Sequence, residues 1–192
     1  IKRINVNVDM KEKELEVIMA EIKVEKVTLD KLEALQKLSI DTFRETFGFD
    51  NTEEELQQFF DENYTLAQLE KDVTDKESDV RFVKVDGREV GFMKVNWGAA
   101  QTEHELENAF EIQRIYILSE CQGFGLGKKL FELALDMAKA GEFDWAWLGV
   151  WEGNIKAQGF YHKYGFEKFS EHLFKVGDKV DTDWLMRKAL KE

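Results

Sequence analysis

The stretch CQGFGLGKKL, residues 121–130, places three glycines within five positions and follows them with two lysines. Glycine at this density lets the backbone adopt left-handed conformations and approach a ligand closely. Two familiar phosphate loops do not fit, because a P-loop needs a glycine five residues after Gly123 and a dinucleotide fingerprint needs one three residues after Gly125. Lys128 stands at that position in both cases. The stretch therefore indicates a close-approach turn of some other kind.

The residues on either side of this turn indicate the elements that hold it. Before it, AFEIQRIYIL (109–118) is apolar, β-branched and aromatic, which is typical of a strand. After it, apolar residues recur at helical spacing and a glycine stop follows; they are Leu126, Leu130, Leu133, Ala134 and Met137, before Gly141. The first N–H groups of a helix have no partners within it and its dipole favours an anion, so this junction can bind phosphate. An ordinary strand-to-helix turn that needs flexible glycines would show the same pattern.

The rest of the chain alternates between strands and helices. Asp86 and Gly87 lie between two alternating runs at 79–97 and predict a hairpin. Asp30 is a candidate cap for a helix that continues to about Phe47. The order predicts an α/β (α+β) domain, in which helices cover a mixed sheet. The other expected elements are strands at 22–29, 144–151, 167–176 and 182–190, and short helices at 52–61, 65–74 and 154–166.

Length and composition fit a single domain, since 192 residues can bury a sizeable core. The predicted fold needs nothing before its first strand, so we expect residues 1–18 to be an N-terminal extension and 19–192 to be the domain. The extension is either non-native sequence ahead of a start at Met19 or an arm used in a dimer. The single cysteine, Cys121, fits a reducing cytoplasm. The histidines are scattered without metal-ligand spacing, so we predict no metal site.

The charge of the chain is strongly negative and unevenly distributed. A formal net charge of −12 argues against nucleic acid and anionic membranes as partners. Between Glu21 and Glu62 there are 12 Asp and Glu residues against 5 Lys and Arg, a net charge of −7. Solvated helix faces are the usual explanation for such a segment, and an acidic funnel for a cationic substrate is the functional one.

Two blocks of the sequence resemble known signatures. QGFGLG, from Gln122 to Gly127, resembles the Q/R-x-x-G-x-G/A motif of the GNAT N-acetyltransferase superfamily, and NIKAQGFYHKYGF (154–166) resembles its N-x-x-A-x-x-F-Y-x-x-x-G-F block. LGVWEGN (148–154) and the tail at 172–190 are similar to the bacterial spermidine/spermine N-acetyltransferases in particular. The resemblance covers roughly residues 20–190. It implies the GNAT fold, a mixed, mostly antiparallel central sheet flanked by helices.

The resemblance also implies acetyl-CoA as the co-substrate and assigns its contacts. The amides of the glycine turn would hold the pyrophosphate. The preceding strand would pair with the pantetheine arm through Ile115 and Ile117, and one of these N–H groups would polarise the thioester carbonyl. Asn154 would hydrogen-bond the pantetheine from the other side. The implied residues of the turn are Gln122, Gly123, Phe124, Gly125, Leu126, Gly127 and Lys128.

Acetyl transfer to an amine needs a base more than an acid, since a lysine-like amine has a pKa near ~10.4 and a thiol one near ~8.5. The resemblance implies Glu111 as the base, directly or through water, and Tyr161 as the acid that protonates the sulfur, with Tyr164 as the competitor. Regular alternation would place Glu111 on the same face as Ile115 and Ile117, and a bulge would break that parity. A surface glutamate and an aromatic core residue are the structural alternatives.

The resemblance implies that the acidic segment at 41–62 occupies the part of the chain that walls the acceptor site in this superfamily. Glu45 is therefore a candidate partner for an ammonium group, and Trp97 and Tyr116 are candidates for a cation–π contact. A surface charge and core aromatics are the alternatives for these three residues. We expect direct acetyl transfer to a small cationic amine, and the resemblance favours a polyamine such as spermidine or spermine. A peptide amine, an aminoglycoside and a non-catalytic acetyl-CoA-binding regulatory protein are the alternatives, in a monomer or homodimer.

Overall fold

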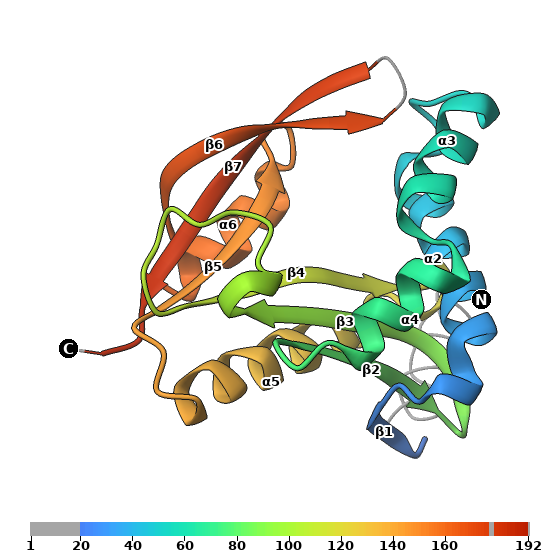
Figure 1. Ribbon diagram of the computed structural model, residues 1–192, viewed down its shortest axis with the longest axis horizontal. Coiled ribbons are helices and arrows are strands. Elements are labelled where there is room, and N and C mark those ends of the chain that lie inside the picture. The colour runs from blue at the N-terminus through green and yellow to red at the C-terminus, as the bar shows by residue number, and fades with distance from the viewer. Residues whose placement is uncertain (1–19, 177–178, 192) are drawn as a thin grey trace, which may run out of the picture.

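The computed structural model describes residues 20–176 and 179–191 of the chain. It contains a seven-stranded sheet in the order β1-β2-β3-β4-β5-β7-β6 (Figure 1). All neighbouring strands are antiparallel except β4 and β5, which are parallel. The predicted extension at residues 1–18 lies outside the described residues. The strands are β1 (Ile22–Lys26), β2 (Ser78–Val85), β3 (Arg88–Trp97), β4 (Ala109–Ile117), β5 (Trp145–Trp151), β6 (Glu167–Val176) and β7 (Lys179–Ala189).

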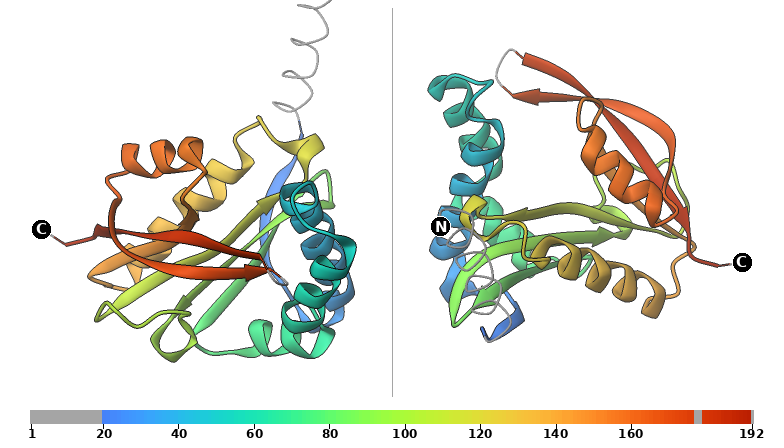
Figure 2. Two further views of the ribbon diagram at one scale, coloured as in Figure 1. Left: turned by 90° about the horizontal axis from the view of Figure 1, so that it is seen from above. Right: turned by 180° about the vertical axis from the view of Figure 1, so that it is seen from behind.

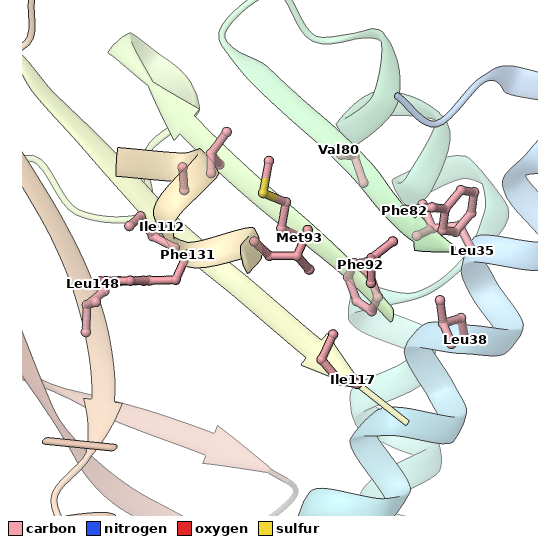
Figure 3. Packing of buried hydrophobic residues seen from close by; sticks show 14 of the residues in the cluster. Leu35, Leu38, Val80, Phe82, Phe92, Met93, Ile112, Ile117, Phe131 and Leu148 are labelled. Atoms are coloured by element: carbon pink, nitrogen blue, oxygen red, sulfur yellow. The ribbon is translucent and has the colours of Figure 1, made fainter. Parts of the chain in front are cut away.

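Helices pack on both faces of the β1–β4 half of the sheet, which confirms the predicted mixed sheet flanked by helices. The first group, which includes α2 and α4, packs against β2 and β3. Another helix, α5, packs against β3, β4 and β5. Figure 3 shows the two sides of β3, with Phe92 directed toward Leu38 of the first group and Met93 toward Phe131 of α5. The helices are α2 (Leu32–Phe47), α3 (Glu53–Asn63), α4 (Leu66–Thr74), α5 (Leu126–Ala140) and α6 (Ile155–Lys163).

Local side chains decide where several helices begin. Thr52 starts α3 with a capping box, in which its hydroxyl accepts from the Glu55 N–H at 3.3 Å and the Glu55 carboxylate accepts from the Thr52 N–H at 2.8 Å. Thr65 caps α4 through one bond only, in which its hydroxyl accepts from the Gln68 N–H at 3.2 Å. The predicted cap at Asp30 is wrong. Its carboxylate accepts from the Thr28 hydroxyl at 2.6 Å inside a short 3-10 turn that precedes α2.

A bulge interrupts the pairing of β4 with β3. Lys94 of β3 pairs with Arg114, but the next residue, Val95, pairs with Ile112. Gln113 is therefore an extra residue on β4, and the side chains on the two sides of it no longer follow one alternation. This irregularity lies between the predicted base and the predicted pantetheine contacts, so it decides how the site is built.

The parallel strands β4 and β5 stay together only briefly. They pair at 109–111 with 145–147 and then separate, so that β5, β7 and β6 turn away from the β1–β4 half of the sheet (Figure 1). The β6–β7 hairpin returns toward α3 across the gap, where α3 and β6 are in contact (Figures 1 and 2). The gap is consequently bounded by the two diverging strands, by α3 and by the hairpin.

Stacked aromatic rings fix α3 against α2 at one wall of this gap. Phe43 of α2 stacks on Phe59 at a centroid distance of 4.2 Å, and Phe60 stacks on Tyr64 at 6.0 Å. All four rings are buried, and ring pairs of this kind prefer defined relative orientations. The wall is therefore an extension of the core. Within the described range, no helix combines the length and the apolarity that crossing a membrane requires.

Candidate active site

A cavity of about 710 Å³ occupies the gap between β4 and β5. It is lined by residues of α2, α3, β4, β5, α6, β6 and β7. Seven of the residues singled out from the sequence lie along this one cavity, although they are spread over 51 positions of the chain from first to last. They are Glu111, Ile115, Tyr116, Ile117, Gln122, Asn154 and Tyr161.

The glycine turn has the geometry of an anion-binding helix start. Gly123 has φ +88° and Gly125 has φ +79°, which are left-handed conformations that side-chain-bearing residues rarely adopt. Gly125 is the N-cap of α5, so the next N–H groups point outward without partners in the helix. A Cβ at either glycine would meet no protein atom within 4 Å. The space outside the turn is therefore open, and an approaching phosphate could contact the backbone directly.

The other predicted residues of the turn have separate tasks. The Gln122 side-chain amide donates to the Ile117 carbonyl at 3.0 Å and ties the turn to the end of β4. The Leu126 side chain is buried, so only its backbone faces the turn. Lys128 is exposed, and its ammonium lies 3.7 Å from the Glu132 carboxylate. Because α5 begins at Leu126, Gly127 also lies in the first turn, whose N–H groups face the open space.

The edge of β4 is open toward the cavity beyond its pairing with β5. Since β5 pairs only with 109–111, it does not cover the backbone of 112–117 on that side. An extended ligand could therefore pair with this edge as an added strand does. Asn154 lies on the α6 side of the cavity and caps that helix, with its Oδ1 accepting from the Ala157 N–H at 3.0 Å.

The bulge changes the parity that regular alternation predicts. The β3 residues 91–96 pair regularly with β2, so Asn96 shares a face of the sheet with Phe92. Their β4 partners are Glu111 and Tyr116, which lie on that face, toward α2. Ile115 and Ile117 pair with Met93 and Gly91 and lie on the opposite face, toward α5. The prediction that Glu111 shares a face of β4 with Ile115 and Ile117 is therefore wrong.

Glu111 is a buried carboxylate at the wall of the cavity and not a surface glutamate. It is 2% exposed and accepts hydrogen bonds from Asn96 Nδ2 at 2.8 Å and from the Thr102 N–H at 2.9 Å. The Thr102 hydroxyl also donates to it. Asn96 is held in turn by the Ser78 hydroxyl, which donates to its side-chain oxygen at 2.7 Å. These donors, which are all neutral groups, fix the position of the carboxylate.

The two tyrosines of α6 and its C-terminus have different surroundings. Tyr161 lines the cavity, packs at 5.4 Å from Phe131, and makes no hydrogen bond through its hydroxyl within the part of the chain that the structure describes. Burial raises the pKa of Tyr161, so its phenol keeps its proton at neutral pH. The Tyr164 hydroxyl donates to Glu132 at 2.8 Å on the surface and lies outside the cavity lining. Of the two, only Tyr161 is placed to reach a ligand in the cavity.

The three predicted acceptor residues are not brought together. Tyr116 lines the cavity, and burial raises the pKa of its hydroxyl well above the usual range. Trp97 stacks on Phe110 at 6.0 Å on the α5 side of the sheet and does not line the cavity. Glu45 accepts hydrogen bonds from the Ser119 N–H at 2.8 Å and from its hydroxyl at 3.0 Å, so it holds the loop after β4. Trp97 is therefore a packing residue, and Glu45 is a residue that supports a loop.

The structure also brings to the cavity charged residues that the sequence did not single out. Asp181 and Asp183 of β7, His172 of β6 and Arg114 of β4 all line it. Asp183 Oδ2 lies 3.8 Å from His172 Nε2. Burial raises the pKa of Asp183, His172 opposes that shift and Asp181 adds to it. The two aspartates lie two positions apart and so share one face of β7, but the sequence carried no signal of which face meets the cavity.

Comparison with known proteins agrees with this geometry. Residues 32–166 match the acetyltransferase (GNAT) family. An uncharacterized N-acetyltransferase of Lactobacillus delbrueckii subsp. lactis is 38% identical over 172 residues, which are 90% of this chain and 99% of that protein. The chain therefore belongs to the GNAT acetyltransferase family, which confirms the predicted family and the predicted enzyme class. No cluster of three or more potential metal-ligating side chains occurs in the described ranges.

Solved structures show the same fold at low sequence identity. The PaiA N-acetyltransferase from Thermoplasma acidophilum, in complex with coenzyme A, superposes with a TM-score of 0.70 at 20% identity, covering 88% of this chain and 99% of that one. The spermidine/spermine N-acetyltransferase SpeG from Vibrio cholerae superposes with a TM-score of 0.62 at 17% identity, covering 88% and 93%. Both likenesses concern the fold alone.

Proposed function

We propose that the protein transfers acetyl from acetyl-CoA directly to a primary amine of a small cationic acceptor. A polyamine such as spermidine or spermine is the acceptor that the sequence resemblance favours. The observation that carries the proposal is the single cavity in which the open β4 edge, a buried carboxylate and a protonated tyrosine meet. A binding protein without activity would have no need of Glu111 and Tyr161 along the same cavity.

The residues present fit the donor molecule. The N–H groups of the turn from Gly123 to Lys128 would hold its pyrophosphate, because the two left-handed glycines leave open space in front of them. The β4 edge near Ile115 and Ile117 would pair with the pantetheine arm, and Asn154 would contact it from the α6 side. When bound, acetyl-CoA supplies a thioester whose sulfur is already a good leaving group.

Two residues would manage the protons of the reaction. As the amine nitrogen forms its bond to the acetyl carbon, Glu111 would take the proton that the nitrogen gives up, directly or through a water molecule. As the carbon–sulfur bond breaks, Tyr161 would donate its proton to the departing thiolate. The products are the acetylated amine and the free thiol, so the protons balance once both residues are reset by solvent. An N–H of Ile115 or Ile117 would stabilise the carbonyl oxygen.

The charges of the cavity support a cationic acceptor. Glu111, Asp181 and Asp183 all line it, and the burial that raises the pKa of Asp183 shows that this carboxylate is poorly solvated. An ammonium group bound beside this carboxylate would stabilise the ionised form of Asp183. The helix α3 also contributes residues to the cavity lining, and the acidic residues of its first turn add negative potential that would attract a cation from solution.

The test is a thiol-release assay with the full chain, acetyl-CoA and a panel of spermidine, spermine, an aminoglycoside and a lysine-containing peptide. We expect CoA release with the polyamines and loss of that release in Tyr161→Phe. Release with the peptide or the aminoglycoside alone would keep the transferase chemistry and discard the polyamine. Binding of acetyl-CoA without release by any amine would overturn the proposed activity.

A further inference from the structure

Arg114 is a cavity-lining arginine whose guanidinium lacks a good partner. Its side chain is 13% exposed and lies on the same face of β4 as Glu111. Among the described residues, the guanidinium makes no hydrogen bond, and the nearest carboxylate oxygen is Asp72 Oδ2 at 3.9 Å. That distance is too long for a hydrogen bond. Five N–H donors at the wall of a cavity are therefore left for a ligand.

Asp72 cannot compensate Arg114 fully, because it already has a closer partner. Its Oδ1 accepts from Lys94 Nζ at 2.8 Å and from Gln68 Nε2 at 3.1 Å. One carboxylate thus faces two cations, both of them largely removed from solvent. Glu111 carries the next negative charge, but it is held by neutral donors and has no ion pair within 4 Å to either cation in the described residues.

Tyr64 adds a second group without a partner at the same place. Its ring lies under Arg114, with the guanidinium carbon 5.0 Å from the ring centroid. The residue is 1% exposed, and no partner for its buried hydroxyl is found among the residues that the structure describes. A buried hydroxyl without a hydrogen bond is costly. Arg114 and Tyr64, which both line the cavity, therefore carry donors that have no hydrogen-bond acceptor among the described residues.

An anion bound at Arg114 would belong to the acceptor and not to acetyl-CoA. The turn that fits the pyrophosphate lies beyond the end of β4 and leads into α5. That helix packs on the face to which Ile115 and Ile117 point, whereas Arg114 lies on the opposite face. Arg114 is on the same side of the sheet as Glu111, where the amine would be deprotonated. A carboxylate matches the planar fork of a guanidinium, which can bind it through two parallel hydrogen bonds.

We propose that Arg114 and Tyr64 form a carboxylate subsite, so that the preferred acceptor is a primary amine that also carries a carboxylate. This inference rests on the proposed acetyl transfer and narrows its acceptor class. The ammonium groups would lie toward Asp181 and Asp183, and the carboxylate would complete the charge balance of Arg114, Lys94 and Asp72. A diamine with a carboxylate on its chain combines both requirements, whereas a simple polyamine leaves the subsite unfilled.

Two pairs of compounds test this directly, because the members of each pair differ only by one carboxylate. L-lysine is compared with cadaverine and L-ornithine with putrescine, using calorimetric binding to the full chain loaded with CoA and kcat/KM from thiol release. We expect the carboxylate-bearing member of at least one pair to be preferred by about 10- to 100-fold, as for a charge-assisted hydrogen-bonded pair. Arg114→Met should reduce that ratio to about one, and Arg114→Lys should leave an intermediate ratio.

The controls separate specificity from folding. Arg114→Met leaves the Lys94–Asp72 pair at 2.8 Å as a balanced ion pair, so we expect it to fold. Arg88→Met removes an exposed arginine whose partner is Glu120, outside the cavity lining, and should leave the preference ratio unchanged. Tyr64→Phe should lower the ratio by only a few-fold, since one neutral hydrogen bond is lost.

The outcomes for the subsite and for the transferase are distinguishable. Equal binding of both members in each pair by the wild-type protein would overturn the subsite, and so would an Arg114→Met effect of the same size on both members. Turnover of cadaverine in either case would still support acetyl transfer. A carboxylate preference in calorimetry that disappears in Arg114→Met, without turnover of any amine, would support the subsite and contradict the proposed activity.

Discussion

The two tyrosines near the end of α6 allow a test in which one substitution should lower activity and the other should lower stability. Tyr161→Phe removes a hydroxyl that makes no hydrogen bond within the described residues but reaches the cavity. Tyr164→Phe removes a hydroxyl that donates to Glu132 at 2.8 Å and does not line the cavity. The two substitutions delete the same atom three positions apart. Their effects should therefore differ only through what that atom contacts.

The structure sets the expected magnitudes. Tyr161→Phe breaks no internal hydrogen bond, so the free energy of unfolding should change by less than about 0.5 kcal/mol. Tyr164→Phe breaks one largely exposed hydrogen bond and should lower the free energy of unfolding by about 0.5–1 kcal/mol. Loss of a general acid costs roughly 10²-fold in kcat, which corresponds to about 2.7 kcal/mol of transition-state stabilisation. That loss should appear in Tyr161→Phe alone.

The pH dependence follows from the direction of the pKa shift. An ordinary tyrosine has a pKa near 10, and burial raises that of Tyr161, so the acid stays protonated between about pH 7 and pH 9. The wild-type rate should therefore rise over this range as the amine loses its proton, without an opposing decrease from Tyr161. Thiol release as a function of pH measures the profile, and urea denaturation measures the stability of each variant.

Three results would contradict this reasoning. An effect of Tyr161→Phe confined to KM would make the residue a packing group of the cavity. A loss of kcat in Tyr164→Phe as large as in Tyr161→Phe would show that the hydroxyl facing the cavity is not the proton donor. A drop in wild-type activity between about pH 7 and pH 9 that disappears in Tyr161→Phe would mean that Tyr161 titrates lower than its burial allows.

Two further predictions concern the base and the glycine turn. Glu111→Gln should lose activity at neutral pH and recover much of it near the pKa of the amine, about 10.4, in a pH-rate profile; an equal loss at every pH would remove Glu111 as the base. Gly125→Ala should lower the free energy of unfolding by about 1–2 kcal/mol, because its φ of +79° is strained for alanine, and should raise KM for acetyl-CoA. Gly159→Ala is the matched control, since it also faces open space but has no positive φ within α6, and should stabilise the protein by about 0.5–1 kcal/mol. Indistinguishable effects of the two glycine variants on stability and KM would refute the conformational argument.

Local patterns were sufficient to predict the elements and the turn. Alternating residues around Asp86 and Gly87 form the β2–β3 hairpin, and helical spacing after Gly125 forms α5. These features depend on neighbouring residues only, through backbone sterics and the side on which apolar groups fall. Asp30 shows the limit of such reasoning, since a nearby threonine hydroxyl binds the carboxylate that would have capped the helix.

The sequence by itself determined the family, the order of the elements, and the close-approach turn at Gly123 and Gly125. Each of these features depends on the types of residues that lie close together in the chain. The acceptor side was decided by the tertiary structure. The extra residue Gln113 places Ile115 and Ile117 on the opposite face of the sheet from Glu111. The alternation of residues within one strand does not reveal such a bulge, because a bulge is defined only by the pairing with the neighbouring strand.

The charges of the cavity depend on long-range contacts in the same way. The surroundings of Arg114 depend on α4, which places Asp72 against Lys94, and on the divergence of β4 and β5, which opens a cavity beside it. A residue type fixes which groups a side chain can donate or accept. Whether those groups find a partner is set by segments far apart in the chain, and so by the fold alone.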